Sequence, residues 1–110
     1  MPSLFEPCGI TQMESLSWAT PPLVRWTGGL VDTVRSHTDS NRGTGFGFDG
    51  RTRSEVLTNL VAVSREAVRL FTEDPARFRD MQRRGFRSRF LWADSAKAYI
   101  HSIYEPVLAW

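Results

Sequence analysis

The chain has 110 residues, 41% of them hydrophobic and 24% charged, which is typical of one folded globular domain and excludes disordered and collagen-like chains. Its single cysteine, Cys8, excludes an internal disulfide and indicates a reducing compartment, and no apolar run approaches the roughly 20 residues of a membrane span. The formal net charge of +2 argues against nonspecific nucleic-acid binding as a main role.

The first half of the chain is predicted to alternate short strands, helices and loops. Residues 4–5 are expected to end a buried strand, which Pro7 stops, and residues 9–19 to form a helix. Residues 23–25 form a second short strand, followed by a tight turn at 27–29. On the helix, the face expected to be buried consists of Ile10, Met13, Leu16 and Ser17. Further expected features are a segment of uncertain type at 30–34, a polar loop at 37–43, and an extended segment at 45–48 with Phe46 and Phe48 on one side.

The second half is predicted to be helical. Ser54 is expected to cap the first helix, Asp74 and Pro75 to start the second, which ends near Gly85, and a third to begin near 94–95. The apolar stripe expected on the first helix is Leu57, Leu60, Val61, Val68 and Phe71. The third helix is expected to end at Pro106 and to bury Ala98, Tyr99 and Ile103. Strand, helix, strand and then helices predict the closing part of an α/β sheet domain.

A turn with ligand-type groups follows the first expected strand. In the segment 6–12 a carboxylate precedes a glycine at a helix start, an arrangement by which open α/β sheets build ligand sites. The backbone amides of Gly9 and Ile10 would face outward at the positive end of the helix dipole, which suits an anion or sugar hydroxyls. The alternative is that Glu6 only caps this helix and Gly9 only turns the chain.

Two further features lie close to this turn in the sequence. Glu14 is about 7.5 Å along the helix from Gly9, enough to separate a sugar held at the helix tip from a ribose held along its side. The alternative for Glu14 is a solvated side chain on an amphipathic helix. The two glycines of Thr27-Gly28-Gly29 could cradle phosphate oxygens through backbone amides, or form an ordinary tight turn.

Other polar and aromatic residues are interpreted as structural. Arginines cluster around Phe78, Phe86 and Phe90 over 77–90 and superficially resemble an RNA-binding face, but carboxylates interrupt them, which favours a solvated helix face with buried aromatics. His37 and His101 have no second ligand at metal spacing, so no metal site is expected. The other aromatic side chains expected in the core are Trp18, Trp92 and Tyr99.

Two stretches go beyond these general patterns. The segment 2–12, PSLFEPCGITQ, resembles a signature of bacterial glycogen synthases and plant starch synthases, and 22–34, PLVRWTGGLVDTV, is similar to that family's second signature. The segments 44–48 and 90–92 follow in the order of the family. The resemblance covers nearly the whole chain, and its first two stretches together are highly specific.

The resemblance implies a retaining glucosyltransferase that moves glucose from ADP-glucose to the non-reducing end of an α-1,4-glucan. The family has two Rossmann-like domains with the active site in the cleft between them. This chain would supply the closing part of the second domain, with the motifs in residues 1–50 and helices in 51–110. The first domain, with its lysine-containing glycine motif, and the Arg/Lys pair that neutralises the pyrophosphate would lie upstream. No cofactor, metal, nucleic acid or membrane is implied, and the location would be the cytoplasm, or a plastid in a plant.

The resemblance also assigns roles to residues. Glu6 would be the catalytic group beside the transferred glucose, and the other residues implied to bind substrate are Cys8, Gly9, Ile10, Glu14, Thr27, Gly28 and Gly29. Cys8 and Gly9 would contact sugar hydroxyls, and the segment 27–29 would meet the distal phosphate. Glu14 stands where many bacterial members carry another residue, and it restores a paired-glutamate spacing that leaves ADP-glucose or UDP-glucose open. Trp26 stands where an arginine is usual, which puts a phosphate role for that position in doubt.

Three hypotheses follow. The chain is a piece of such a synthase without turnover by itself, a stand-alone nucleotide-sugar-binding or interaction module, or a small basic protein that contacts nucleic acid. The two glycine-containing stretches favour the first over the third. Met1 falls where the family has mid-chain sequence, so an internal start, a partial gene or a trimmed chain is expected, in agreement with the first hypothesis.

Overall fold

The structure is a computed structural model that describes residues 1–109. Its first part consists of helix α1 (Thr11–Ser17), strand β1 (Leu23–Arg25), helix α2 (Gly29–Thr33) and strand β2 (Phe46–Phe48). Two longer helices follow, α3 (Arg53–Glu73) and α4 (Pro75–Arg87). The remaining described residues form a helical arm of α5 (Trp92–Tyr99), a π-helical turn η1 (Ile100–Tyr104) and α6 (Glu105–Leu108).

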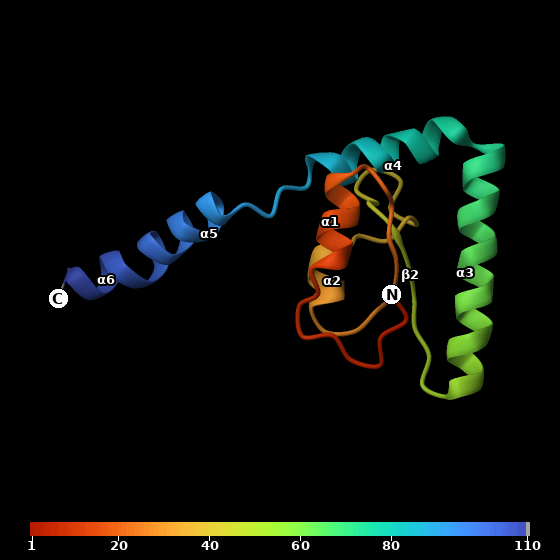
Figure 1. Ribbon diagram of the computed structural model, residues 1–110, viewed down its shortest axis with the longest axis horizontal. Coiled ribbons are helices and arrows are strands. Elements are labelled where there is room, and N and C mark those ends of the chain that lie inside the picture. The colour runs from red at the N-terminus through yellow and green to blue at the C-terminus, as the bar shows by residue number, and fades with distance from the viewer. Residues whose placement is uncertain (110) are drawn as a thin grey trace.

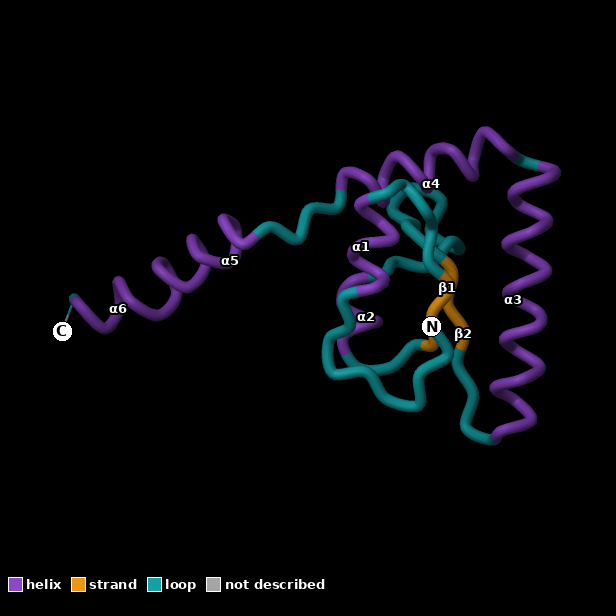
Figure 2. The backbone as a smooth tube through the Cα atoms, viewed as in Figure 1, coloured by secondary structure: helices purple, strands orange, loops and turns teal. Residues whose placement is uncertain are grey.

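The two strands pair in parallel, with Leu23 beside Phe46 and Arg25 beside Phe48. Helices α1 and α2 lie on one side of the strand pair and α3 on the other, while α4 runs across one end and joins the two sides (Figures 1 and 2). Parallel strands between helices make this an α/β arrangement, the class that the sequence predicts.

The core follows from the alternation of side chains along β2. Phe46 and Phe48 are both buried on the same side of the strand, as predicted. They form one core cluster with Val63 and Leu70 of α3 and Met81 of α4. A second cluster, between β1 and α2, consists of Val24, Leu30 and Val34. Each such side chain contributes about 1.5–3 kcal/mol when it is fully buried, so these clusters hold the helices on the strands.

The two long helices begin at side-chain caps. Thr52 caps α3 in a reciprocal capping box, in which the Glu55 amide donates to the Thr52 hydroxyl at 3.2 Å and the Thr52 amide donates to the Glu55 carboxylate at 3.2 Å. The prediction of Ser54 as the cap is wrong by two residues, because the T-x-x-E pattern starts at Thr52. Asp74 caps α4 and Pro75 is its first residue, as predicted.

The predicted apolar stripe on α3 is largely exposed. The side chains of α3 that pack on the core are Val56, Leu60, Val63, Ala67 and Leu70. Leu60 is the one member of the predicted stripe among them, and the exposed members are Leu57, Val61, Val68 and Phe71. Helix α3 is therefore apolar over two adjacent faces, and only one of them packs on the core clusters of the described chain.

The arm extends away from the rest of the molecule (Figure 1), whose longest dimension is 55 Å. The prediction that Ala98, Tyr99 and Ile103 are buried is wrong, because all three are exposed. Pro106 does not end the helical path either. It lies in the first turn of α6, where a missing amide hydrogen leaves no intrahelical bond unmade, and the π-helical turn precedes it.

Residues 4–5 do not form the predicted buried strand. Leu4 is 86% and Phe5 69% exposed, since no element within residues 1–109 covers them. Met1 alone lies along β1, where its ammonium group donates to the Leu23 carbonyl at 2.7 Å. The other aromatic side chains predicted to be buried but found exposed are Trp18, Phe86, Phe90, Trp92 and Tyr99. Of the aromatics expected on the arginine-rich helix, Phe78 is partly buried against the core.

Candidate functional site

The two signature segments of the sequence lie in contact through their backbones. The Gly29 amide donates to the Glu6 carbonyl at 2.9 Å. Gly28 has a φ of +48°, and a Cβ atom there would overlap the Glu6 carbonyl oxygen. A Cβ atom at Gly29 would lie 2.6 Å from Cys8 Cα. Only glycines allow the turn 27–29 to approach the loop 6–9 this closely.

The side chain of Gln12 holds the loop 6–9 in place through hydrogen bonds to its backbone. It is fully buried, and its Nε2 donates to the carbonyls of Cys8 at 2.9 Å and Gly9 at 3.0 Å. The Thr33 hydroxyl oxygen of α2 lies 3.0 Å from the same nitrogen, so the two amide hydrogens are shared among three acceptors. Gly9 has a φ of +77°, and a Cβ atom there would lie 2.5 Å from Gln12 Oε1. The conformation of the loop is thus set by one amide side chain and by the absence of a side chain at position 9.

Several backbone amides at this place have no acceptor within residues 1–109. They are the amides of Gly9, Ile10, Thr11 and Gln12 at the start of α1, and those of Thr27 and Gly28 before α2. The first amides of a helix have no intrahelical acceptor, and the dipole gives that end a partial positive charge. The two segments therefore offer backbone donors at the carboxyl end of β1, which immediately precedes the turn 27–29.

The carboxylates of Glu6 and Glu14 belong to different parts of this region. Glu6 is half-buried, and its Oε2 accepts a 3.4 Å hydrogen bond from the Ser3 hydroxyl. Glu14 is exposed in the first turn of α1. Neither carboxylate forms an ion pair within the part of the chain that the structure describes. Both are thus free to meet a ligand.

A cavity of ≈ 730 Å³ lies between α1 and the start of the arm. Cys8, Ile10 and Glu14 line it on the α1 side, which brings three of the predicted site residues to one surface. Opposite them the lining includes the aromatic and aliphatic side chains of Phe90, Leu91 and Trp92. Glu6 and the turn 27–29 are not among its lining residues. The predicted site residues therefore divide into a backbone-paired group and a cavity-lining group.

The histidines do not gather with other metal-ligating groups. No group of three or more His, Cys, Asp or Glu side chains that could hold a metal ion occurs within residues 1–109. His37 lies against Phe46, with ring centroids 4.8 Å apart, and burial lowers its pKa. His101 lies 2.8 Å from the Glu105 carboxylate in the arm. In the same residues, no helix combines the length and apolar character of a membrane span.

Sequence reasoning missed Gln12 and Thr33. The predicted helix 9–19 is shorter in the structure. Its buried side chains are Leu16, as predicted, and Gln12, which was not predicted, while Met13 is partly buried and Ser17 is exposed. Ile10, which the sequence placed on the buried face, is exposed. The signal for Gln12 was its position four residues before Leu16, on the same helix face, where a polar residue needs internal partners.

Comparisons with known proteins identify relatives over almost the whole chain. No protein-family model matches it. A glycogen synthase of Aeromonas salmonicida is 42% identical over 110 residues, which are 99% of this chain and 22% of that protein. A glycogen synthase of Myxococcus xanthus is 43% identical over 109 residues, 99% of this chain and 21% of that protein. The chain thus spans about a fifth of the length of the curated relatives it matches.

The fold has a counterpart among solved structures. The catalytic domain of starch synthase IV from Arabidopsis thaliana, bound to ADP and acarbose, matches with a TM-score of 0.78 and 28% sequence identity. The match covers 91% of this chain and 20% of that one. Both the resemblance seen in the sequence and the α/β class are confirmed. The chain belongs to the glycogen synthase and starch synthase family and corresponds to about a fifth of the length of these related proteins.

Proposed function

We propose that this chain is the donor-binding part of a synthase that transfers glucose from ADP-glucose, with retention, to the non-reducing end of an α-1,4-glucan. The observation that carries the proposal is the 42% identity to a glycogen synthase over 99% of the chain. The starch synthase IV structure that matches this fold is bound to ADP and acarbose, which agrees with a nucleotide-sugar donor and a glucan acceptor. Turnover requires the upstream domain, and the setting is the cytoplasm, or a plastid in a plant.

The donor sugar is assigned to the loop 6–9. The Glu6 carboxylate would stabilise the positive charge that develops at the anomeric carbon as the bond to the diphosphate breaks. Backbone groups of Cys8 and Gly9, and the amide of Ile10, would bind the glucose hydroxyls. The support is geometric, since the Gln12 side chain holds the Cys8 and Gly9 carbonyls in place.

The departing diphosphate is assigned to the turn 27–29. The amides of Thr27 and Gly28 have no acceptor within residues 1–109, so they are available to an anion. Preorganised amides that face a developing negative charge lower the barrier without reorganising. Glu14 is assigned to the nucleotide ribose, and UDP-glucose is the alternative donor. No step in this scheme calls for a metal ion, because backbone amides and upstream cations would neutralise the diphosphate.

A chimera tests the proposal. The matching 22% of the Aeromonas salmonicida protein is replaced by this chain, and incorporation of labelled glucose from ADP-glucose into glycogen is measured. We expect transfer by the chimera and none by the chain alone. The unaltered host is the positive control, and far-UV circular dichroism verifies that the chimera is folded. A folded chimera without transfer, or transfer by the chain alone, contradicts the proposal.

A further inference from the structure

Helix α3 carries apolar side chains that no element within residues 1–109 covers. They are between 49% and 63% exposed and consist of Leu57, Val61, Val68 and Phe71. Single exposed apolar side chains are common on folded proteins, but four along one helix form a continuous surface. Helix α3 lies on the opposite side of the strand pair from α1 and α2 (Figure 1), so this surface is separate from the candidate site.

The exposed apolar residues belong to a stripe with the spacing of a helix that pairs with another helix. Its positions, which advance alternately by three and four residues and are called here the outer stripe, are Ser54, Leu57, Val61, Ser64, Val68 and Phe71. Such a repeat keeps one side of a helix against a partner helix, here over about 26 Å at 1.5 Å per residue. None of these six residues belongs to the core clusters. The outer stripe is therefore a second packing face of α3.

A hollow of ≈ 580 Å³ lies at the middle of the outer stripe. Its lining residues are Leu60, Val61, Ser64, Arg65 and Val68. The last four have the i, i+3, i+4, i+7 spacing of the socket that receives one side chain of a partner helix. The Ser64 hydroxyl donates to the Leu60 carbonyl at 2.8 Å. Because this donor already has an acceptor, an apolar side chain can cover it without leaving a buried hydrogen bond unmade.

We propose that a second copy of this chain docks on the outer stripe with its α3 antiparallel, to form a dimer with two-fold symmetry. The side-chain layers of this dimer, each present twice, are Ser54 with Phe71, Leu57 with Val68, and Val61 with Ser64. Small side chains thus face larger ones. A parallel pair would place Ser64 on Ser64 and Phe71 on Phe71, which leaves a gap in one layer and crowds another. The packing therefore favours the antiparallel, isologous arrangement.

The charges beside the outer stripe suit the same arrangement. At each end of the seam, Arg53 of one copy comes to lie beside Asp74 of the other, and Arg53 has no ion pair within residues 1–109. Asp74 Oδ1 accepts the Arg77 amide at 3.1 Å, which leaves its second oxygen available. Near the centre, Arg65 comes to lie beside the neutral Thr58 of the other copy. The dipoles of the two helices also oppose each other, so no like charges meet at the seam.

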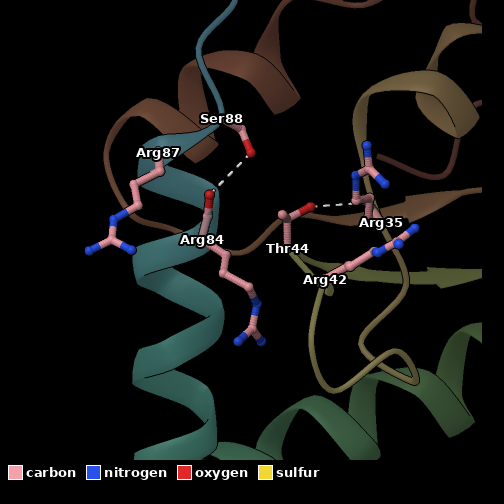
Figure 3. Close-up of a pocket in the computed structure, with 6 residues that line it drawn as sticks. All are labelled: Arg35, Arg42, Thr44, Arg84, Arg87 and Ser88. Atoms are coloured by element: carbon pink, nitrogen blue, oxygen red, sulfur yellow. Dashed lines mark hydrogen bonds between the residues drawn. The ribbon is translucent and has the colours of Figure 1, made fainter.

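Other arginines of the chain stay away from the seam. Arg84 and Arg87 are in the last turn of α4, the end remote from α3 (Figure 1), and Arg35 and Arg42 are on the loop before β2. Figure 3 shows that these four side chains point in different directions. The loop comes near α3 at Glu66, on the helix face opposite the outer stripe. Two copies paired through the outer stripe therefore do not bring these cations together, and both candidate sites stay open.

Single cysteines test the antiparallel register. Leu57→Cys and Val68→Cys are made in two chains of different tag, each in a Cys8→Ser background, and are equilibrated in a glutathione buffer. We expect a disulfide between the two variants when they are mixed and none in either variant alone, because equal positions of the two copies lie about 16 Å apart along the helix axis. Linked pairs of either variant alone would indicate a parallel pair. Such pairs, or the absence of the mixed disulfide, overturn the proposal.

Sedimentation velocity over a range of concentrations measures the strength of the dimer. The full chain carries Trp92→Ser and Leu108→Ser, which remove apolar side chains of the arm, and we expect a reversible monomer–dimer equilibrium. Val68→Glu should weaken the dimer about tenfold or more, because the seam would bury an unpaired carboxylate. Ala62→Glu is the matched control, since Ala62 is exposed on α3 outside the outer stripe, and it should leave the equilibrium unchanged. Circular dichroism verifies that each variant is folded.

Two outcomes of this measurement overturn the proposal. One is a chain that stays monomeric at every concentration, which would leave the outer stripe to a partner of another sequence. The other is a folded Val68→Glu chain that dimerises as strongly as the Ala62→Glu chain.

Discussion

The Gln12 amide and the Thr33 hydroxyl meet at 3.0 Å and join helix α1 to helix α2. The Thr33 hydroxyl in turn donates to the carbonyl of Gly29 at 2.8 Å. Since the Gly29 amide is bonded to the Glu6 carbonyl, a continuous path of hydrogen bonds runs from α1 through α2 to the loop 6–9. The two signature segments are therefore positioned by residues outside the groups expected to contact a substrate.

Thr33→Val tests this path with a nearly isosteric change. It removes one acceptor from Gln12 and one donor from Gly29, so the free energy of unfolding should fall by about 1–2 kcal/mol. Urea denaturation followed by circular dichroism measures the change. Thr58→Val is the control, because Thr58 is exposed on α3, and it should change stability by less than about 0.5 kcal/mol. Equal effects of the two substitutions would show that the path does not stabilise the fold.

Substitutions of Glu6 and of Glu14 are expected to change different kinetic constants of the active chimera. Glu6→Gln should lower kcat about 100-fold or more, because the carboxylate would act on charge that develops only in the transition state. Glu14→Gln should mainly raise KM for the nucleotide sugar, since the ribose feels the same field before and after the reaction. Steady-state kinetics of both variants, with ADP-glucose and UDP-glucose, measure this. A kcat of Glu6→Gln within a few-fold of the unaltered chimera contradicts the role of Glu6.

The chain alone is expected to self-associate. The exposed apolar side chains of the arm and of α3 form surfaces that stay in contact with water in a monomer and that self-association would bury. These exposed side chains include Leu57, Val68, Leu91, Trp92 and Leu108. Size-exclusion chromatography with light scattering should show species larger than 12.5 kDa, and Trp92→Ser with Leu108→Ser should shift them toward the monomer. A monomer with a sharp, cooperative melt for the unaltered chain would argue against this.

Stability should fall as the pH is lowered through the range in which His37 titrates. Burial, the largest effect, lowers the pKa of His37 from its ordinary 6.5; the nearby Glu66 carboxylate opposes this shift, and the Arg77 guanidinium adds to it. The unfolded chain therefore binds a proton on this residue at a higher pH than the folded chain does. The free energy of unfolding decreases below pH 6.5 until the folded chain is protonated as well.

Urea denaturation at several pH values, with and without His37→Gln, measures this effect. The variant should lose most of the pH dependence between about pH 5 and 6.5, because His is the side chain that titrates there. The lowered pKa of Glu66, caused mainly by its hydrogen bond with Arg69, acts at lower pH and should persist in the variant. An unchanged slope in His37→Gln would show that His37 is not its source.

The elements predicted correctly are those whose signals are local. Strand Leu23–Arg25, the paired phenylalanines of β2 and the Asp74 cap each depend on a few adjacent residues. The α3 stripe was wrong because the helix is apolar on two adjacent faces, and the sequence alone does not say which face meets β2. The arm and residues 4–5 were predicted as buried from their apolar character, but burial also requires a partner surface.

The sequence identified the segments of the candidate site but not the side chain that holds these segments together. The sequence placed Glu6, Cys8 and the turn 27–29 in signature segments, and the structure brings these segments together. The sequence did not predict that Gln12 holds the loop 6–9, because its hydrogen bond with Thr33 forms only when α1 packs beside α2. The hydrogen bonds to the Cys8 and Gly9 carbonyls depend on the folded shape of the loop.

The contact between the loop 6–9 and the turn 27–29 is made by backbone atoms and spares the side chains of Glu6 and Cys8. The contact between the two segments therefore does not depend on which side chain stands at these two positions. Substitutions at positions 6 and 8 should leave this backbone contact in place, whereas even one methyl group at Gly28 would push the two segments apart. The glycines therefore determine how closely the two segments approach, and the side chains at positions 6 and 8 do not.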